Sequence, residues 1–279
     1  MKANNLTISI PYRGCDRNCP YCVSKMTGYL TANEEAFSGN LEKVRTVADN
    51  SGITSLLVTG KGEPFLNTDT IDLLLDVFGD YPLEIQTNGH QLLTWYNEDP
   101  DSFLDQCRLT GGINVFAVSL DRLKSLQTCR DMFRCLDQAG AVVRVTMNAS
   151  SWLKDTSFET LIDECLEAGV RQFSIRKLTI PHFVDNKMSK DYQKTSQWIT
   201  DHADGTEYDQ LIKEFKGGSY EKLRELNFGA TIFDVRGVSF THFDYCIQDS
   251  NSGEDIRSLI YQEDGHLYTS WNSRASIIF

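Results

Sequence analysis

Three cysteines near the start of the chain have the spacing of metal ligands. Cys15, Cys19 and Cys22 fall within eight residues, in one short segment. Thiolates bind zinc ions and iron–sulfur clusters, and three of them in one loop can surround a single compact centre. A structural zinc site or an electron-transfer cluster normally has four protein ligands, and this segment offers no fourth cysteine. The spacing therefore indicates a metal centre with one open position, where a substrate or cofactor can bind.

The other five cysteines lack such a grouping. Unpaired cysteine usually packs as a small buried apolar side chain, and we predict this role for all five. Eight cysteines in 279 residues is far below the cysteine density of small secreted disulfide-bonded domains, so we expect a reducing compartment. The residues predicted to pack in this way are Cys107, Cys129, Cys135, Cys165 and Cys246.

Repeated strand–helix units are predicted to position the cysteine segment. Short β-rich apolar runs alternate with segments of helical period, and Gly52, Gly140 and Gly169 stand where helices would end. This alternation is typical of βα units around a parallel sheet. The predicted strands are residues 6–10, 53–59, 83–87, 113–119, 142–147 and 170–175, and the predicted helices are residues 33–49, 69–78, 100–108, 122–139 and 157–168.

The polarity of the last two strands favours a barrel over an open doubly wound sheet. Arg144 and Asn148 share one face of the fifth strand, and Ser174 and Arg176 share one face of the sixth. Strands of a doubly wound sheet are covered by helices on both faces and are apolar throughout. A polar inner face suits an incompletely closed barrel around a ligand, so we predict an α/β fold with a partial (β/α)6 TIM-like barrel. The alternative is that both arginines lie near strand ends and reach solvent.

The pattern changes after residue 177. We predict that residues 1–177 form the barrel core, and that residues 178–279 form a C-terminal α+β cap that decides substrate specificity. A helix is predicted at residues 220–226. Strands at residues 257–262 and 266–271 are predicted to form a hairpin through the turn at Glu263, Asp264 and Gly265.

The cysteine segment resembles the signature of the radical S-adenosylmethionine (radical SAM) superfamily. That signature is CxxxCxxC with an aromatic residue before the last cysteine, and Tyr21 occupies the aromatic position. Residues 59–64 (TGKGEP), 87–89 (TNG) and 119–121 (SLD) resemble the ends of family strands. Lys61 stands where relatives often have another glycine, and we interpret it as a solvated loop lysine. The resemblance covers about residues 6–176.

This resemblance implies a 4Fe-4S cluster ligated by Cys15, Cys19 and Cys22, with S-adenosylmethionine at the open iron. A reductant such as flavodoxin or ferredoxin would supply one electron. The 5′-deoxyadenosyl radical formed from the cofactor would then abstract hydrogen from a small-molecule, peptide or nucleoside-type substrate. The residues predicted to contact S-adenosylmethionine are Tyr21, Gly60, Gly62, Glu63, Asn88, Ser119, Arg144, Asn148 and Arg176.

Four candidate site residues have a second interpretation. Arg144 and Asn148 are chosen because a buried polar face needs partners, and a structural role is the alternative for each. Arg176 is assigned either to the cofactor or to an anionic substrate. Cys246 is a candidate catalytic thiol that donates hydrogen to a product radical or anchors an intermediate, with simple burial as its alternative.

Composition limits the class of protein. Apolar residues make up 41% and charged residues 24%, which is ordinary for a globular protein. No apolar run approaches the roughly 18 residues of a transmembrane helix, and residues 1–11 lack a signal-peptide core, so we predict a cytoplasmic protein without a membrane partner. The net charge of −12 counts against bulk nucleic-acid binding, and hence against an RNA-modifying relative. Two further classes of protein compete with this prediction: a glycyl-radical activase and an iron–sulfur electron-transfer protein.

Overall fold

A computed structural model describes residues 2–28, 31–181, 187, 189–226, 230–244, 255–271 and 273–279. The chain forms two compact units, and each combines segments that are far apart in sequence. The first unit contains residues 1–17, 28–116 and 249–279, and the second contains residues 18–27 and 117–248. Cys15 therefore belongs to the first unit, whereas Cys19 and Cys22 belong to the second.

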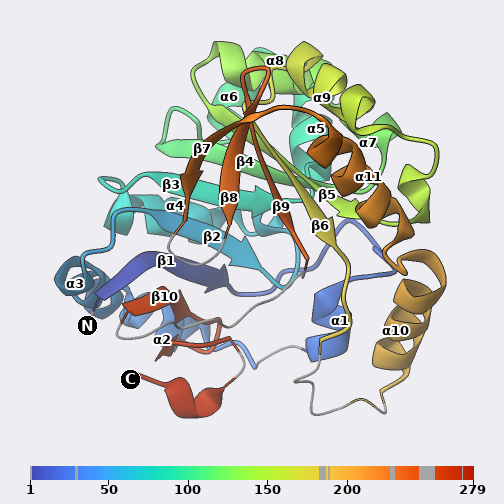
Figure 1. Ribbon diagram of the computed structural model, residues 1–279. Coiled ribbons are helices and arrows are strands. Elements are labelled where there is room, and N and C mark those ends of the chain that lie inside the picture. The colour runs from blue at the N-terminus through green and yellow to red at the C-terminus, as the bar shows by residue number, and fades with distance from the viewer. Residues whose placement is uncertain are drawn as a thin grey trace. The chain divides into compact units, whose positions relative to one another are not determined.

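The first unit contains a mostly parallel sheet with the strand order β11-β10-β1-β2-β3-β4 (Figure 1). Strands β10, β1, β2 and β3 run parallel to one another, and β11 is antiparallel to β10. Alternate apolar side chains of β1, namely Leu6, Ile8 and Ile10, are buried, as the pleat of a strand packed on a core requires. The elements of this unit are β1 (Lys2–Ile10), α2 (Glu34–Gly39), α3 (Leu41–Ser51), β2 (Leu56–Gly60), η1 (Pro64–Leu66), α4 (Thr68–Phe78), β3 (Leu83–Thr87), α5 (His90–Glu98), α6 (Phe103–Gln106), the start of β4 (Ile113–Leu120), β10 (Asp255–Tyr261), β11 (Leu267–Tyr268) and η3 (Arg274–Ser276).

The second unit continues from β4 in the strand order β4-β5-β6-β9-β8-β7. Strands β5, β6 and β9 are parallel, and β9, β8 and β7 form an antiparallel meander. Its elements are α1 (Val23–Thr27), the end of β4, α7 (Leu123–Thr128), α8 (Arg130–Gln138), β5 (Val142–Ala149), η2 (Ser151–Leu153), α9 (Phe158–Glu167), β6 (Gln172–Lys177), α10 (Lys190–His202), α11 (Thr206–Gly217), β7 (Glu221–Glu225), β8 (Thr231–Val235) and β9 (Val238–Phe243).

The strand series is open, because β11 and β7 each have one neighbour. All six strands predicted from the sequence are present, as β1 to β6, and βα connections join them. Gly52, Gly140 and Gly169 have positive φ angles of 71°, 91° and 73°, as expected for glycines that end helices. These features confirm the predicted α/β class with a barrel-type sheet that does not close.

One helix prediction is wrong, and another is correct only in part. Residues 220–226 form β7, an exposed strand paired with β8, so strand pairing overrides the helix propensity of its Glu, Lys, Leu and Arg residues. Residues 100–108 contain only the short helix α6, and the longer helix α5 begins earlier, after Gly89 with a φ of 76°. Two other predicted helices are each divided, at Asn40 and at Cys129.

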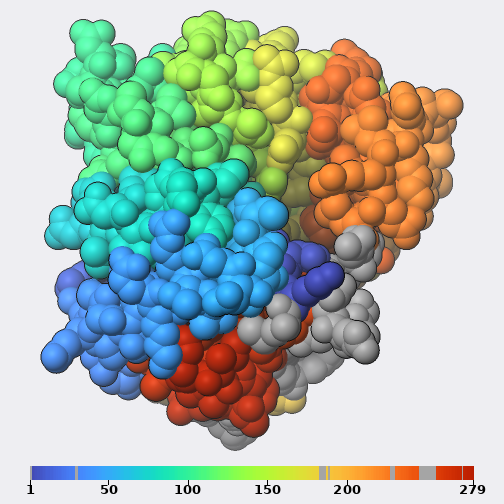
Figure 2. All heavy atoms as spheres, turned by 90° about the vertical axis from the view of Figure 1, so that its left-hand side faces the viewer, coloured from blue at the N-terminus to red at the C-terminus, as the bar shows by residue number. Residues whose placement is uncertain are grey.

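The C-terminal region has both helices and strands, as predicted, and its strands extend the sheets of both units. β9 lies parallel to β6, and β10 lies parallel to β1. The C-terminal segment lies against the segment that contains α2 and α3 (Figure 2). Tyr261, the last residue of β10, donates its hydroxyl to the Phe37 carbonyl oxygen at 2.6 Å. The predicted division at residue 177 stays a prediction about function, because the compact units divide the chain differently.

None of the helices in the described ranges is both long enough and apolar enough to cross a bilayer. Three of the cysteines predicted to pack in the core, Cys107, Cys129 and Cys165, are buried, and Cys135 is partly buried.

Candidate active site

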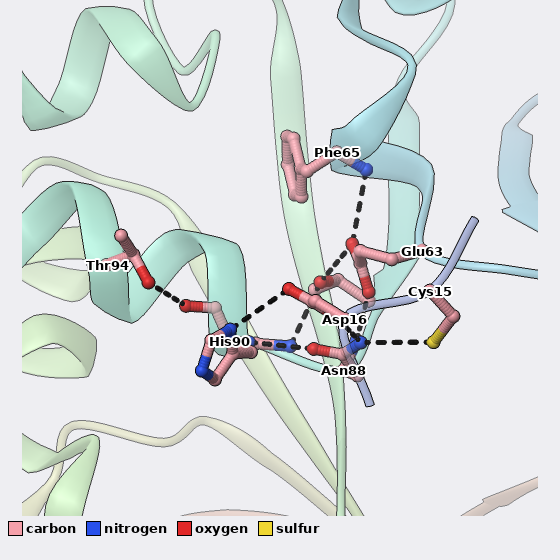
Figure 3. Close-up of polar contacts among 9 residues, drawn as sticks. Cys15, Asp16, Glu63, Phe65, Asn88, His90 and Thr94 are labelled. Carbon is pink, nitrogen blue, oxygen red and sulfur yellow. Dashed lines mark hydrogen bonds and ion pairs between the residues drawn. The ribbon is translucent and has the colours of Figure 1, made fainter. Parts of the chain in front are cut away.

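The first cysteine of the signature lies beside the loop that follows β3. The Asn88 side-chain amide, Nδ2, is 3.7 Å from Cys15 Sγ and donates to Asp16 Oδ1 at 2.7 Å (Figure 3). The second oxygen of that carboxylate, Asp16 Oδ2, is 3.0 Å from His90 Nδ1. The end of β3 and the start of α5 are thus attached to the cysteine segment by side-chain contacts.

Glu63 fixes the same loop from the end of β2. Its Oε1 accepts from the Thr87 hydroxyl at 2.7 Å and from the Phe65 N–H at 3.2 Å, and its Oε2 accepts from the Asn88 N–H at 2.8 Å. The residue is only 3% exposed. The carboxylate predicted to meet the cofactor is therefore engaged mainly in joining two loops of the protein.

Burial raises the pKa of Glu63 from its ordinary 4.5 to about 7, although its three hydrogen bonds oppose the rise. The folded protein therefore holds this proton more tightly than the unfolded chain does. The stability that Glu63 contributes is fully present below pH 4.5 and is lost as the pH rises through about 7.

Glu63→Gln should remove this pH dependence. A pKa rise of this size corresponds to roughly 3 kcal/mol, so the unfolding free energy of the wild type, relative to the variant, should fall by about that amount between pH 4.5 and pH 8. Urea unfolding of both proteins across this range measures the difference. An unchanged difference at all pH values would show that the carboxyl group titrates normally.

Gly62 is packed directly against the backbone of the cysteine segment. A Cβ at this position would lie 2.0 Å from the Gly14 carbonyl oxygen and 2.8 Å from Tyr12 Cε2. The Glu63 N–H donates to the same Gly14 oxygen at 3.0 Å. Gly60 is less confined, since a Cβ there would lie 3.5 Å from Ile10 Cγ1, an ordinary contact. Glycine is therefore required at position 62 for steric reasons.

Lys61 is not a solvated loop lysine, so that interpretation is wrong. Its side chain is 17% exposed, and Nζ donates to the Gly28 carbonyl oxygen at 2.6 Å and lies 3.8 Å from Glu263 Oε1. Burial lowers the pKa of Lys61, and the charge of Glu263 opposes that change. The sequence could not reveal this contact, because Glu263 follows Lys61 by about two hundred residues.

The second part of the cysteine segment lies in the other unit and leads into α1. The Cys22 N–H donates to the Cys19 carbonyl oxygen at 3.4 Å, which closes a tight turn between the two cysteines. Lys25 Nζ donates to the same carbonyl oxygen at 2.8 Å and to Asn18 Oδ1 at 2.5 Å. These bonds hold the backbone between the two cysteines in one conformation.

Tyr21 lies in an aromatic cluster of the second unit. Its ring centroid is 6.0 Å from that of Trp152 and 5.5 Å from that of Trp198, and its hydroxyl donates to Asp121 Oδ2 at 3.0 Å. Burial, followed by the charges of Cys19 and Asp121, raises the pKa of Tyr21 well above its ordinary range, and a hydrogen bond with the Asn148 side chain opposes this. The hydroxyl therefore remains a hydrogen-bond donor.

Tyr21→Phe should destabilise the protein by about 1.5–3 kcal/mol, because it removes the hydroxyl donor of Asp121 Oδ2 and leaves this buried carboxylate with Arg122 Nε at 3.9 Å from Oδ1. Urea unfolding measures this loss. Tyr96→Phe is the matched control, since no side-chain hydrogen bond of Tyr96 occurs in the described residues. Equal stability of the wild type and Tyr21→Phe would mean that the hydroxyl contributes nothing to the fold.

The predicted polar face is present across β5, β6 and β9. Thr146 and Ser174 are opposite each other and their hydroxyls are 2.8 Å apart, and Asn148 is opposite Arg176. Arg144 Nε donates to Gln172 Oε1 at 2.7 Å. The strand β9, which was not predicted beside β6, adds further residues to this face: Ser239, Thr241 and Phe243.

The remaining predicted site residues have separate surroundings. Ser119 is exposed near the end of β4, whereas Cys246 lies outside the described residues.

Cys15, Cys19 and Cys22 form no disulfide. Within the described part of the chain, no group of three or more His, Cys, Asp or Glu side chains is already gathered for metal binding. No role was predicted for Asp16, His90 or Asp121. The available signals were the position of Asp16 between two signature cysteines and the position of Asp121 at the end of the SLD segment.

No family model matches the chain. Over 174 residues it is 27% identical to GTP 3′,8-cyclase of Clostridium acetobutylicum, which covers 61% of this chain and 49% of the relative. Over 94 residues it is 31% identical to 7-carboxy-7-deazaguanine synthase of the same organism, which covers 32% of this chain and 40% of the relative. The chain thus spans half or less of the length of these curated relatives.

The fold is similar to that of SuiB from Streptococcus suis. The structure of SuiB bound to S-adenosylmethionine has a TM-score of 0.52 at 17% identity, over 96% of this chain and 59% of SuiB. The structure bound to its precursor peptide SuiA has a TM-score of 0.55 at 16% identity, over 97% of this chain and 60% of SuiB. SuiB and the two curated relatives are all radical SAM enzymes.

The chain is similar in sequence to two radical SAM enzymes and in fold to a third. Radical SAM neighbours have partial TIM barrels, in agreement with the open sheet of this chain. These similarities confirm the resemblance noted at the CxxxCxxC segment and support S-adenosylmethionine as the expected cofactor.

Proposed function

We propose that this protein is an enzyme with one 4Fe-4S cluster, ligated by Cys15, Cys19 and Cys22, that cleaves S-adenosylmethionine reductively. The observation that carries the proposal is the spacing of three thiols, without a local fourth, in a chain similar to radical SAM enzymes. The three cysteines are suitable ligands for a 4Fe-4S cluster, because their thiols form no disulfide and none of the three residues is fully buried. When bound, the cluster and S-adenosylmethionine supply the electron transfer and the 5′-deoxyadenosyl radical that abstracts hydrogen from the substrate.

The residues of the first unit would bind the amino-acid end of the cofactor. The loop backbone at Gly60 and Gly62 offers carbonyl oxygens to the cofactor's ammonium group, and the Glu63 carboxylate keeps that loop attached to residues 87–89. We assign Glu63 mainly to this positioning role, because its oxygens already accept three hydrogen bonds.

The polar residues of the second unit would bind the remaining groups. Arg144 and Arg176 are the candidate partners for a carboxylate of the cofactor or of an anionic substrate, because a guanidinium donates to both oxygens of such a group. Ser119 and Asn148 would contact ribose hydroxyls, and Tyr21 would lie near the adenine. Cys246 keeps its candidate role as a hydrogen donor.

The substrate class in this proposal is a small molecule, a peptide or a nucleoside-type compound. The names of the curated relatives refer to GTP and to a deazaguanine, and SuiB binds a precursor peptide. The net charge of −12 favours these classes over a polynucleotide. We further propose a cytoplasmic location and a flavodoxin or ferredoxin as reductant, since the signature thiols must stay reduced to bind iron.

Binding of S-adenosylmethionine to the reconstituted protein tests this function. The cofactor should change the electron paramagnetic resonance spectrum of the reduced cluster, because it adds ligands to the open iron. S-adenosylhomocysteine, which lacks the sulfonium, should not support cleavage and serves as the comparison. A spectrum that is identical with and without saturating S-adenosylmethionine would contradict an open iron site.

A further inference from the structure

We propose that Asn88 and Asp16 are positioning residues that hold the Cys15 sulfur and set the reduction potential of the cluster. The inference rests on the proposed function, because it requires a cluster at Cys15. It assigns the Asn88 side chain to the protein rather than to S-adenosylmethionine. All the contacts that carry it lie within the first unit, and they are drawn in Figure 3.

The orientation of the Asn88 amide is fixed by the chemistry of its partners. The His90 backbone N–H is only a donor, and it lies 2.8 Å from Asn88 Oδ1. An ionised Asp16 carboxylate is only an acceptor, and its Oδ1 lies 2.7 Å from Asn88 Nδ2. Exchanging the amide oxygen and nitrogen would place donor against donor and acceptor against acceptor. The N–H group, and not the carbonyl, therefore faces Cys15 Sγ at 3.7 Å.

Asp16 is held in turn by a second residue. One carboxylate oxygen accepts from Asn88, and the other lies 3.0 Å from His90 Nδ1. Asp16 directly follows Cys15 in the chain, so a contact that fixes its side chain also restricts the backbone that carries the thiol. Asp16 therefore restricts the backbone of Cys15, and Asn88 contacts the Cys15 sulfur directly.

The backbone of Asn88 is anchored independently of its side chain. Its N–H donates to Glu63 Oε2 at 2.8 Å, and the next N–H, of Gly89, donates to the Thr87 hydroxyl at 3.0 Å. The Asn88 side-chain amide is therefore held by a fixed loop. Such a loop keeps the length of the hydrogen bond to the sulfur constant when the charge on the sulfur changes.

This geometry has a predictable effect on electron transfer. Reduction adds negative charge to the cluster and its thiolates, and an N–H donor at a ligand sulfur stabilises that charge. Loss of the donor should therefore shift the midpoint potential to more negative values. Asn88 would make the cluster easier to reduce by a physiological reductant.

Redox titration of the reconstituted protein, followed by the electron paramagnetic resonance signal of the reduced cluster, tests the inference. Asn88→Ala removes the donor, and Asn88→Asp keeps the acceptor for the His90 N–H while replacing the donor by an oxygen. Both variants should shift the midpoint potential to more negative values. Asn50→Ala, at an exposed helical position remote in sequence from the loop, is the control and should leave the potential unchanged.

The outcomes separate this inference from the proposed function. A wild-type protein that binds no cluster would end the proposed function itself. Asn88 variants with a full cluster and an unchanged or more positive potential would overturn the inference alone. Loss of the cluster in Asn88→Ala, at an unchanged unfolding temperature, would support the role in holding Cys15.

Discussion

Gly62→Ala should remove most of the bound cluster and destabilise the protein by about 1–3 kcal/mol, the usual cost of overpacking a closed site. The added methyl group would lie 2.0 Å from the Gly14 carbonyl oxygen and 2.9 Å from its carbonyl carbon. These are backbone atoms, so relief requires a shift of the chain that leads into Cys15. Iron and sulfide content after anaerobic reconstitution, together with urea unfolding, measures both effects.

Gly39→Ala is the matched control for this substitution. Gly39 ends α2, and nothing in the described residues lies within 4 Å of a Cβ placed there. The control should bind a full cluster and be as stable as the wild type or slightly more stable, because alanine favours a helix by up to about 1 kcal/mol over glycine. Wild-type iron content in Gly62→Ala would show that the close approach at Gly14 does not hold the cluster loop.

Cys19→Ala should abolish the visible sulfur-to-iron absorption of the reconstituted protein. In the proposed cluster each of the three thiolates would hold one iron, and loss of one thiolate would weaken binding of the cluster. The expected result is near-complete loss of iron in Cys19→Ala and in the triple alanine variant of Cys15, Cys19 and Cys22. Cys135→Ala changes the same chemistry at a partly buried position in α8 and should retain the cluster. A triple variant that still bound four irons would require different ligands.

Local sequence patterns were sufficient to predict the parallel strands. Their short apolar runs are separated by helical periods, and the helix-ending glycines have the expected positive φ angles. The alternation of polar and apolar residues in β5 also predicted a shared polar face correctly, since Thr146 and Ser174 are hydrogen-bonded across neighbouring strands. These features depend on residues close together in sequence.

Features that depend on distant contacts were not predictable. The pairing of β10 with β1 joins opposite ends of the chain, and no local pattern specifies it. Lys61 is partly buried for the same reason, because its neighbour Glu263 belongs to the C-terminal segment. The strand β7 has the composition of an exposed helix and is a strand only because β8 lies beside it.

In the candidate site too, the residue types were predictable from the sequence, whereas the contacts between distant residues were not. The CxxxCxxC spacing revealed the resemblance to radical SAM enzymes, and Gly62 was predicted to contact the cofactor. The structure adds a steric reason within the protein, the approach to Gly14, and reveals that Glu63 accepts three hydrogen bonds from its own chain. A motif specifies which residues are present, whereas their partners depend on how the loops fold together.

Formation of 5′-deoxyadenosine is the most direct test of the proposed function. The protein, reconstituted anaerobically with iron and sulfide, is reduced and incubated with S-adenosylmethionine, with and without candidate small-molecule, peptide and nucleoside substrates. We predict 5′-deoxyadenosine that depends on the reductant and is absent from the triple alanine variant of Cys15, Cys19 and Cys22. A wild-type protein that carries an intact, reduced four-iron cluster and forms no 5′-deoxyadenosine under any of these conditions would contradict the proposal.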